Sequence, residues 1–564
     1  MIRQLRILAV SALALSVAVP VQAEGLAGAY LAARQASFYS DYEEAARYYT
    51  QALARDPANP ALLENAVTAF VGLGDFDSAL PIARKMQADG IDSQIGHMVL
   101  VVSHVLDDDY DQVFADYEAG LAIGPLVDGL VQAWSYVGKG QMSDALAAFD
   151  DVTNTRGTKV FGLYHKALAL AMVGDYEGAD KILSGEEDGP LQATRNGILT
   201  HAEVLSQLER NDDAIELIDS VFGNDPDPAV KELRDALVAG ETLPFTRIDN
   251  ATDGLAEMFF SVAGVLNSEA APAYTLIYAR MAEFLDPDNV NVLLMSAQLL
   301  EELERYSLET EVYDRVPRDH PSFHIAELGR AEALRKSDKT DAAIEVLSQL
   351  AKSHGDLPAV HSSLGDILRQ AERFEEATEA YDRAIALFKE PDASQWIAYY
   401  ARGITHERQG EWDASEADFR KALELSPNQP YVLNYLGYSL VERQEKLDEA
   451  LEMIEEAVAR RPDDGFVTDS LGWVLYRLGR YDEAIVHMER AVELMPVDPI
   501  ITDHLGDVLW AVGRKREAEF QWMRALSFDP EEEDGERIRR KLEVGLDVVL
   551  EEEGAEPLAV ANEG

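Results

Sequence analysis

A pattern of small residues recurs every 34 residues near the C-terminal end of the chain. The stretch SLGWVLYRLGRYDEAIVHMERAVELMP contains Gly472, Ala484, Ala491 and Pro496, and the following stretch HLGDVLWAVGRKREAEFQWMRALSFDP repeats all four positions 34 residues later. Apolar residues in each stretch follow a helical period that a central glycine interrupts, which predicts two helices joined by a tight turn. Because one such hairpin cannot bury its apolar face alone, the repeat restricts the chain to a stack of helical hairpins.

The first small position can be followed through most of the sequence and predicts about fourteen helical hairpins. It is occupied by Ala33, Val67, Val101, Ala133, Ala167, Ala202, Ala263, Ala297, Ala331, Gly365, Gly403, Gly437, Gly472 and Gly506. The copies between Tyr431 and Pro530 are regular, whereas several earlier copies are weaker. The sequence therefore predicts an all-α superhelical solenoid.

These repeats resemble the tetratricopeptide repeats, a family whose 34-residue unit is a pair of antiparallel helices with this pattern of small residues. The resemblance covers nearly the whole chain after the N-terminal segment, and it implies binding of proteins or extended peptide segments. The runs LNYLGYSL, DSLGWVLYRLGRYDEAI and HLGDVLWAVGR also resemble Gram-negative cell-envelope repeat proteins that act as adaptors for a carboxyl-terminal processing protease. Such adaptors are often lipoproteins, but this chain has no cysteine to carry a lipid.

The N-terminal segment MIRQLRILAVSALALSVAVPVQA has the features of a secretory signal peptide. Two arginines precede an apolar core from Ile7 to Val19, and the small residues Val21 and Ala23 favour cleavage after Ala23. The alternative is an uncleaved anchor, although the apolar core is shorter than the roughly 20 residues that span a bilayer. We therefore expect a periplasmic protein whose mature chain has no integral membrane span.

The repeats predict two subdomains separated by a segment without helical period. The predicted organisation is a signal peptide at 1–23, six repeats at 24–239, a loop or hinge at 240–254, eight repeats at 255–530, a capping helix at 531–552 and a disordered acidic tail at 553–564. The spacing from Gly365 to Gly403 is longer than the others, which indicates a stretched turn within the second subdomain.

The net charge of -54 argues against nucleic-acid binding, which depends on cationic side chains that displace counterions from the phosphates. The basic residues form two small clusters, Arg514 to Arg516 and Arg537 to Lys541. We interpret both clusters as solvated helix faces near the end of the solenoid, with a docking edge for an acidic partner as the alternative. The acidity itself fits either a basic partner or a saline habitat.

No catalytic or metal-binding motif stands out from the repeats. The eleven histidines are scattered, and Pro321 interrupts the helix that His320 and His324 would need to share one face. The chain has no phosphate-binding glycine loop, no GxSxG motif and no large segment outside the repeats. We therefore predict a binding protein that is not an enzyme and has no cofactor or bound metal.

A stripe of four positions in the first helix of each hairpin is expected to line the concave side of the solenoid. The stripe is mostly polar in the middle repeats, for example at Ala359, Ser362, Asp366 and Arg369, but apolar or aromatic towards both ends. The N-terminal apolar tract comprises Ile95, Met98, Val102, Val105, Val127, Leu130, Trp134, Val137, Phe161, Tyr164, Leu168 and Ala171. The C-terminal stripe comprises Tyr431, Asn434, Tyr438, Val441, Phe466, Asp469, Trp473, Tyr476, Ile500, Asp503, Asp507 and Trp510.

Apolar surface of this extent normally binds a partner, so each stripe is either a binding surface or packed against neighbouring helices of a tightly wound superhelix. We predict that the C-terminal stripe is the main protein-binding groove, formed by Asn434, Tyr438, Asp469, Trp473, Tyr476, Asp503, Asp507 and Trp510. Its aromatic and acidic residues suit an extended peptide that offers amides and basic groups. The function predicted is a periplasmic scaffold that presents a client to an envelope enzyme, and the alternative is a structural subunit of an envelope or secretion complex.

Overall fold

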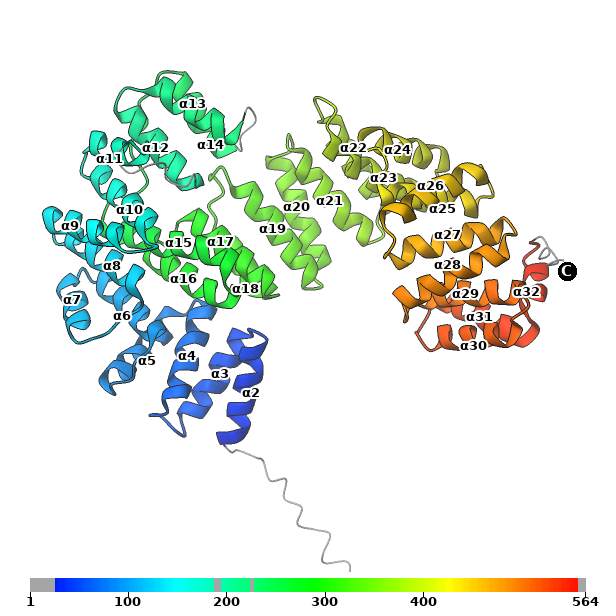
Figure 1. The fold of residues 1–564 in the computed structure, drawn as a ribbon, viewed down its shortest axis with the longest axis horizontal. Helices are drawn as coiled ribbons and strands as arrows, with labels where there is room; N and C mark the ends of the chain where they lie inside the picture. Colours follow the sequence, from blue (N-terminus) through cyan, green and yellow to red (C-terminus); the bar gives the residue numbers. More distant parts are fainter. Residues whose placement is uncertain (1–25, 187–193, 224–227, 556–564) are drawn as a thin grey trace, which may run out of the picture. The chain divides into compact units, whose positions relative to one another are not determined.

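The computed structural model describes residues 26–186, 194–223 and 228–555, and every regular element in these ranges is helical (Figure 1). This confirms the predicted all-α fold. The predicted signal peptide and residues 556–564 of the predicted tail lie outside the described residues. The chain divides into two compact units between Val346 and Leu347, and we call the described residues before and after this division unit 1 and unit 2.

Unit 1 is a series of helical hairpins followed by a hairpin that folds back onto them. Its helices are α2 (Leu26–Phe38), α3 (Tyr42–Leu53), α4 (Pro60–Leu73), α5 (Phe76–Ala88), α6 (Gln94–Leu106), α7 (Tyr110–Glu118), α8 (Pro125–Gly138), α9 (Met142–Asn154), α10 (Lys159–Met172), α11 (Tyr176–Leu183), α12 (Arg195–Gln207), α13 (Asn211–Phe222), α14 (Pro228–Val238), α15 (Ala251–Glu269), α16 (Pro272–Leu285), α17 (Val290–Glu302), α18 (Tyr306–Tyr313) and α19 (Phe323–Lys336).

The division between the units falls within the next helix, and unit 2 continues the hairpins to the C-terminal end of the described chain. The remaining helices are α20 (Thr340–Ser353), α21 (Pro358–Gln370), α22 (Phe374–Ala386), the short 3-10 helix η1 (Ala393–Gln395), α23 (Trp396–Arg408), α24 (Trp412–Leu425), α25 (Pro430–Glu442), α26 (Leu447–Arg460), α27 (Gly465–Arg477), α28 (Tyr481–Leu494), α29 (Pro499–Ala511), α30 (Lys515–Leu526), α31 (Glu532–Val544) and α32 (Leu546–Glu552).

The small residues of the repeat lie where the two helices of a hairpin approach most closely. A Cβ atom at Gly472 would lie 2.8 Å from the Met488 side chain, and one at Gly506 would lie 2.3 Å from the Trp522 indole. In both hairpins the large side chain follows the glycine by sixteen residues, and the same spacing relates Gly365 to Tyr381 and Gly403 to Phe419. Each glycine therefore makes room for one large buried side chain of the second helix.

The hairpin α15–α16 packs against four earlier first helices of unit 1. Helix α15 contacts α8 and α10, while α16 contacts α4 and α6 (Figure 1). Their side chains form one buried cluster with residues of α4 to α10. A chain segment that follows the first six hairpins is thus part of the core of those hairpins.

The predicted hinge at 240–254 lies inside unit 1, because the α15–α16 hairpin beyond it packs onto helices before it. Residues 241–250 are not helical, as the missing period indicates, and α15 begins at Ala251. This segment is nevertheless held in place. The backbone N–H of Thr246 donates to Glu203 Oε2 at 2.9 Å, Arg247 Nη2 donates to Glu203 Oε1 at 2.6 Å, and Ile248 is buried.

The predicted capping helix at 531–552 consists of two helices, α31 and α32. Gly545 separates them with φ 85°, a left-handed conformation that favours glycine and ends α31. Ile538, Leu546 and Val549 are buried, and α31 packs against α30 of the last hairpin.

Candidate protein-binding surface

The N-terminal apolar tract is covered by the α15–α16 hairpin. Trp134 at its centre is fully buried and shares a cluster with Leu255 and Phe259 of α15. Gly254 brings the α15 backbone directly onto this indole, since a Cβ atom there would lie 2.5 Å from the Trp134 ring. Of the two interpretations that the sequence leaves open, packing against the chain's own helices applies to this tract.

Polar residues within the same contact are paired with one another. The Trp134 indole donates to Nδ1 of His165 at 3.2 Å, and burial lowers the pKa of His165 to about 3, so the imidazole is neutral and able to accept. The Tyr164 hydroxyl donates to Oε1 of Glu257 at 2.9 Å. Burial raises the pKa of Glu257 to about 7, even though hydrogen bonds from Tyr164 and Asn196 oppose the shift. These pairs show that α15 is seated specifically and leaves little of the tract free.

The C-terminal stripe is partly covered, and Trp473 belongs to the covered part. This indole is only 7% exposed, stacks on Tyr476 and His504 with ring centroids 4.9 Å and 4.0 Å away, and donates from Nε1 to Oε1 of Glu442 at 2.6 Å. Tyr476 is buried as well. Trp473 therefore links α25, α27 and α29, and Tyr476 packs against Tyr481 of α28, so neither ring presents a free face.

The three aspartates of the stripe are paired with cations of the same chain. Lys541 of α31 is completely buried, and its Nζ donates to Oδ2 of Asp503 at 2.7 Å and to Oδ1 of Asp507 at 2.6 Å. His504 lies 3.1 Å from the carboxylate of Asp469. Burial opposes a charge on His504, but Asp469 and the neighbouring aspartates outweigh it and raise its pKa. The sequence suggests that a partner supplies the basic group for these aspartates, but Lys541 of α31 occupies that position.

The second basic cluster, Arg537 to Lys541, is predicted to be a solvated helix face, and the position of Lys541 shows that this prediction is wrong for that residue. Arg540 fits that interpretation, because it pairs on the surface with Glu552, whereas Arg537 pairs with Glu553 and also lies 3.6 Å from the carboxylate of the buried Asp507. Lys541 instead points inward between the aspartates of α29 and lies 5.7 Å from the centroid of the buried Trp522 ring. A lysine is tolerated there because both aspartates compensate its charge.

Trp510 lies at the end of the stripe and is half-buried. Its indole donates to Oδ2 of Asp547 at 3.0 Å, and the ammonium of Lys515 lies 4.2 Å from its ring centroid. Gly545 approaches the same ring so closely that a Cβ atom would lie 2.7 Å away. Helix α32 therefore occupies part of the space beside Trp510.

Asn434 and Tyr438 of α25 are both half-buried. Burial raises the pKa of the Tyr438 hydroxyl, and negative charges at Glu442, Asp469 and Asp534 of α31 contribute to the same shift. Four of the eight predicted groove residues are partly exposed to solvent, namely Asn434, Tyr438, Asp503 and Trp510. The other four, Asp469, Trp473, Tyr476 and Asp507, are buried.

The first position of the stripe is exposed in four successive repeats of unit 2. The side chains are those of Ile397 at 53%, Tyr431 at 41%, Phe466 at 55% and Ile500 at 50% exposure, and we call them the exposed row. They lie near the start of α23, α25, α27 and α29, where α31 and α32 do not bury them. Isolated apolar residues on a surface are common, but a repeated row on one edge indicates a contact surface.

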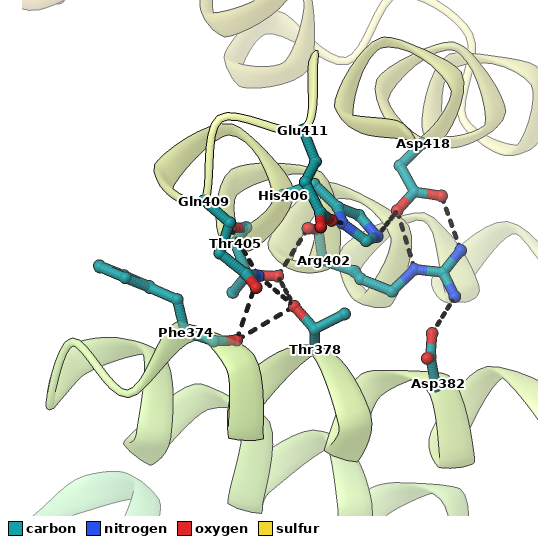
Figure 2. Close-up of polar contacts among 9 residues, drawn as sticks. All are labelled: Phe374, Thr378, Asp382, Arg402, Thr405, His406, Gln409, Glu411 and Asp418. Carbon is teal, nitrogen blue, oxygen red and sulfur yellow. Dashed lines mark hydrogen bonds and ion pairs between the residues drawn. The ribbon is translucent and has the colours of Figure 1, made fainter. Parts of the chain in front are cut away.

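A polar network fixes α23 between its neighbours and so positions the start of this row. Figure 2 shows Arg402 of α23 between Asp382 of α22 and Asp418 of α24, with N–O distances of 2.6 Å and 2.7 Å. On the same helix, Thr405 accepts from the Thr378 hydroxyl of α22 at 2.9 Å (Figure 2). Buried polar groups with all partners in place favour one arrangement of the helices.

The described residues contain no group of three or more His, Asp or Glu side chains arranged to hold a metal ion. Among the helices described, none is both long and apolar enough to cross a membrane.

Comparison with known proteins identifies the repeats. Models described as tetratricopeptide repeat match residues 39–94, 328–390, 362–430, 428–496 and 470–533. The TPR repeat-containing protein PA4667 of Pseudomonas aeruginosa is 28% identical over 160 residues, which are 28% of this chain and 26% of that protein. Tetratricopeptide repeat protein 13 of Homo sapiens is 28% identical over 192 residues, which are 33% of this chain and 22% of that protein.

This chain thus spans about a quarter of the length of the curated relatives it matches. Among solved structures, the crystal structure of the APC/C hetero-tetramer Cut9-Hcn1 is 15% identical with a TM-score of 0.38, and the match covers 96% of this chain and 99% of that chain.

The matched residues are similar to tetratricopeptide repeats, and the described residues form an all-helical solenoid of stacked hairpins. Proteins built from these repeats mediate protein–protein interaction and act as scaffolds.

Proposed function

We propose that this protein is a periplasmic scaffold that binds other proteins through the concave side of unit 2 and presents a client to an envelope enzyme such as a processing protease. The observation that carries the binding surface is the exposed row, in which Ile397, Tyr431, Phe466 and Ile500 occupy the same position of successive repeats. Aromatic side chains in such a row supply large contact area at a low cost in conformational entropy.

Because part of the C-terminal stripe is buried, the proposed binding surface includes only the predicted groove residues that remain exposed to solvent. Asn434 and Tyr438 lie beside Tyr431 on α25 and remain half-exposed, so they belong to the proposed surface. Asp469, Trp473, Tyr476 and Asp507 are buried beneath it and support it from below. In this proposal the four residues hold α27 and α29 in position and do not touch the client.

The periplasmic location follows from the predicted signal peptide, and the adaptor role follows from the resemblance of the last repeats to protease adaptors of the cell envelope. An acidic scaffold favours clients with basic segments, because opposite charges speed encounter and suppress binding of acidic proteins.

Site-specific photo-crosslinking in Gram-negative cells tests the proposal. A photoreactive phenylalanine analogue at Tyr431 or Phe466 should yield the same crosslinked proteins, including an envelope enzyme and its client. The matched control is Val486 of α28, which is 63% exposed on the second helix of the same hairpin as Phe466. Equal yields at Val486, or crosslinks only to subunits of one stable large complex, would contradict the adaptor role.

A further inference from the structure

A cavity of about 260 Å³ opens between α21 and α23 in unit 2, next to the first residue of the exposed row. Ala359 and Ser362 of α21 form one wall, Ile397 and Ala401 of α23 form the opposite wall, and Phe388 closes one side. Most of the lining surface is apolar, and its polar groups come from Asp366, Ser362, Tyr381, Ser394 and Gln395.

The cavity lies beside the longest connection between two helices of unit 2. Gly365 and Gly403 are 38 residues apart instead of 34, and the additional residues lengthen the link between α22 and α23. This link contains η1 and is held by hydrogen bonds from Ser394 N to Asp392 Oδ1 at 2.8 Å and from Gln395 Nε2 to the Glu390 carbonyl at 2.7 Å. Since Ser394 and Gln395 line the cavity, the longer link forms part of its wall.

The size of the cavity restricts what it can hold. Pockets for drug-sized ligands typically have volumes of about 300–1,000 Å³, whereas a cavity of about 150 Å³ holds a benzene molecule. A volume of about 260 Å³ therefore suits one large apolar side chain better than a nucleotide or an organic cofactor.

The charges beside the cavity are mainly negative. Asp366 faces into it and accepts from the Tyr381 hydroxyl at 2.8 Å, with Arg369 3.8 Å away. The link at 387–395 carries Glu390 and Asp392 against a single base, Lys389. Hydrogen bonds from Ser394 lower the pKa of Asp392, so this exposed carboxylate stays ionised at neutral pH. A basic segment would complement this edge.

The position of the cavity indicates an extended occupant. Packed helices lie about 8–10 Å apart, and three residues of extended chain cover about 10 Å. An extended segment that follows the exposed row would thus place roughly one side chain in three against each successive helix.

We propose that the cavity between α21 and α23 binds one large apolar side chain of an extended segment of the partner protein, and that Lys or Arg residues flanking that side chain lie against Asp366 and Asp392. This inference rests on the proposed function, because it specifies the chemistry of the client segment at one end of the exposed row.

Selection from a phage-displayed library of random dodecapeptides on the chain beginning at Glu24 provides the test. Enriched peptides should share one Leu, Ile, Met, Phe or Trp with Lys or Arg within two positions. A fluorescein-labelled peptide of this kind should bind Ser362→Trp, in which the new indole fills the cavity, at least tenfold more weakly than the wild type. Ser527→Trp at the exposed end of α30 is the matched control and should bind normally.

Two charge-reversal variants, Asp392→Lys and Asp413→Lys, provide an independent test if Ser362→Trp lowers the melting temperature. Asp392→Lys should weaken binding of the labelled peptide several-fold, whereas Asp413→Lys, the same charge change on exposed α24, should not. Equal binding to Ser362→Trp and the wild type, equal effects of the two Lys variants, or no enrichment of peptides would each overturn the cavity proposal. The proposed function fails separately, if crosslinks at Tyr431 and Phe466 are absent.

Discussion

The two units place similar apolar stripes in different settings. In unit 1, α15 and α16 lie on the stripe, and side chains such as Leu255 and Phe259 bury it in an apolar contact. In unit 2, the cover reaches only the last repeats and carries a buried lysine, Lys541, between two aspartates. The comparison teaches that apolar content alone does not mark a binding surface in a solenoid. An apolar stripe can bind a partner only where helices of the same chain do not already cover it.

The largest effect expected from this comparison is on Trp134. Trp134→Ala should reduce the free energy of unfolding by about 3–5 kcal/mol, because it leaves a cavity beneath α15 and removes the partner of His165. Urea unfolding followed by circular dichroism measures the change. Val160→Ala, at a half-exposed position of α10, serves as the control and should change stability by less than about 0.5 kcal/mol. A Trp134→Ala variant with normal stability and impaired partner binding would make the tract a binding surface.

The next effect concerns how the free energy of unfolding depends on pH through Glu257, which lies in the contact between α15 and the apolar tract. Burial raises the pKa of Glu257 from 4.5 to about 7, so the folded state holds a proton that the unfolded state releases between these values. The free energy of unfolding should therefore fall by about 3 kcal/mol as the pH rises from 4.5 to 7, since one pKa unit corresponds to about 1.4 kcal/mol.

Glu257→Gln should remove this part of the pH dependence. The variant should match the wild type near pH 4.5 and exceed its stability at about pH 8, because the amide carries no charge that must be buried. Glu241→Gln, at an exposed position in the preceding loop, is the control and should follow the wild-type curve. Parallel stability curves for Glu257→Gln and the wild type across this range would show that Glu257 of α15 is not buried against the apolar tract.

A smaller effect is expected when the unfolding free energies lost on replacing Trp473 and Trp510 of the predicted groove are compared. Trp473→Ala should cost about 3 kcal/mol of unfolding free energy, since it removes a buried, doubly stacked indole and leaves Glu442 without its donor. Trp510→Ala should cost only about 1 kcal/mol, because this ring is half-exposed. Chemical unfolding of both single variants gives the ratio, and equal losses would mean that α32 buries Trp510 more completely than its contacts indicate.

The hairpins could be predicted from the sequence because their signal is local. A small residue such as Gly472 and a large one such as Met488 recur at fixed positions of one repeat, and close contact between the two helices requires both. The longer spacing before Gly403 likewise indicates an irregular link, although the cavity beside that link depends on how α21 and α23 pack.

The covers of the two stripes could not be predicted in this way. The contact of α16 with α4 joins residues roughly 200 positions apart, and it depends on how strongly the intervening hairpins curve. Lys541 sits in a cluster of four basic residues, and only the register of α31 against α29 determines which of them is buried. The sequence pattern therefore indicates the stripe, but it does not indicate which of its residues stay exposed.

The absence of cysteine from the natural chain allows the central claim to be tested with single thiols. Val102→Cys places a thiol in the covered tract of unit 1, where Val102 is fully buried, and Ala359→Cys places one at the exposed edge of the cavity in unit 2. Labelling with a maleimide under native conditions should be at least about a thousandfold slower for the Val102→Cys variant, because reaction there requires the hairpin to open. Similar labelling rates for the two variants would show that α15 and α16 leave the unit 1 face open, which would contradict the account.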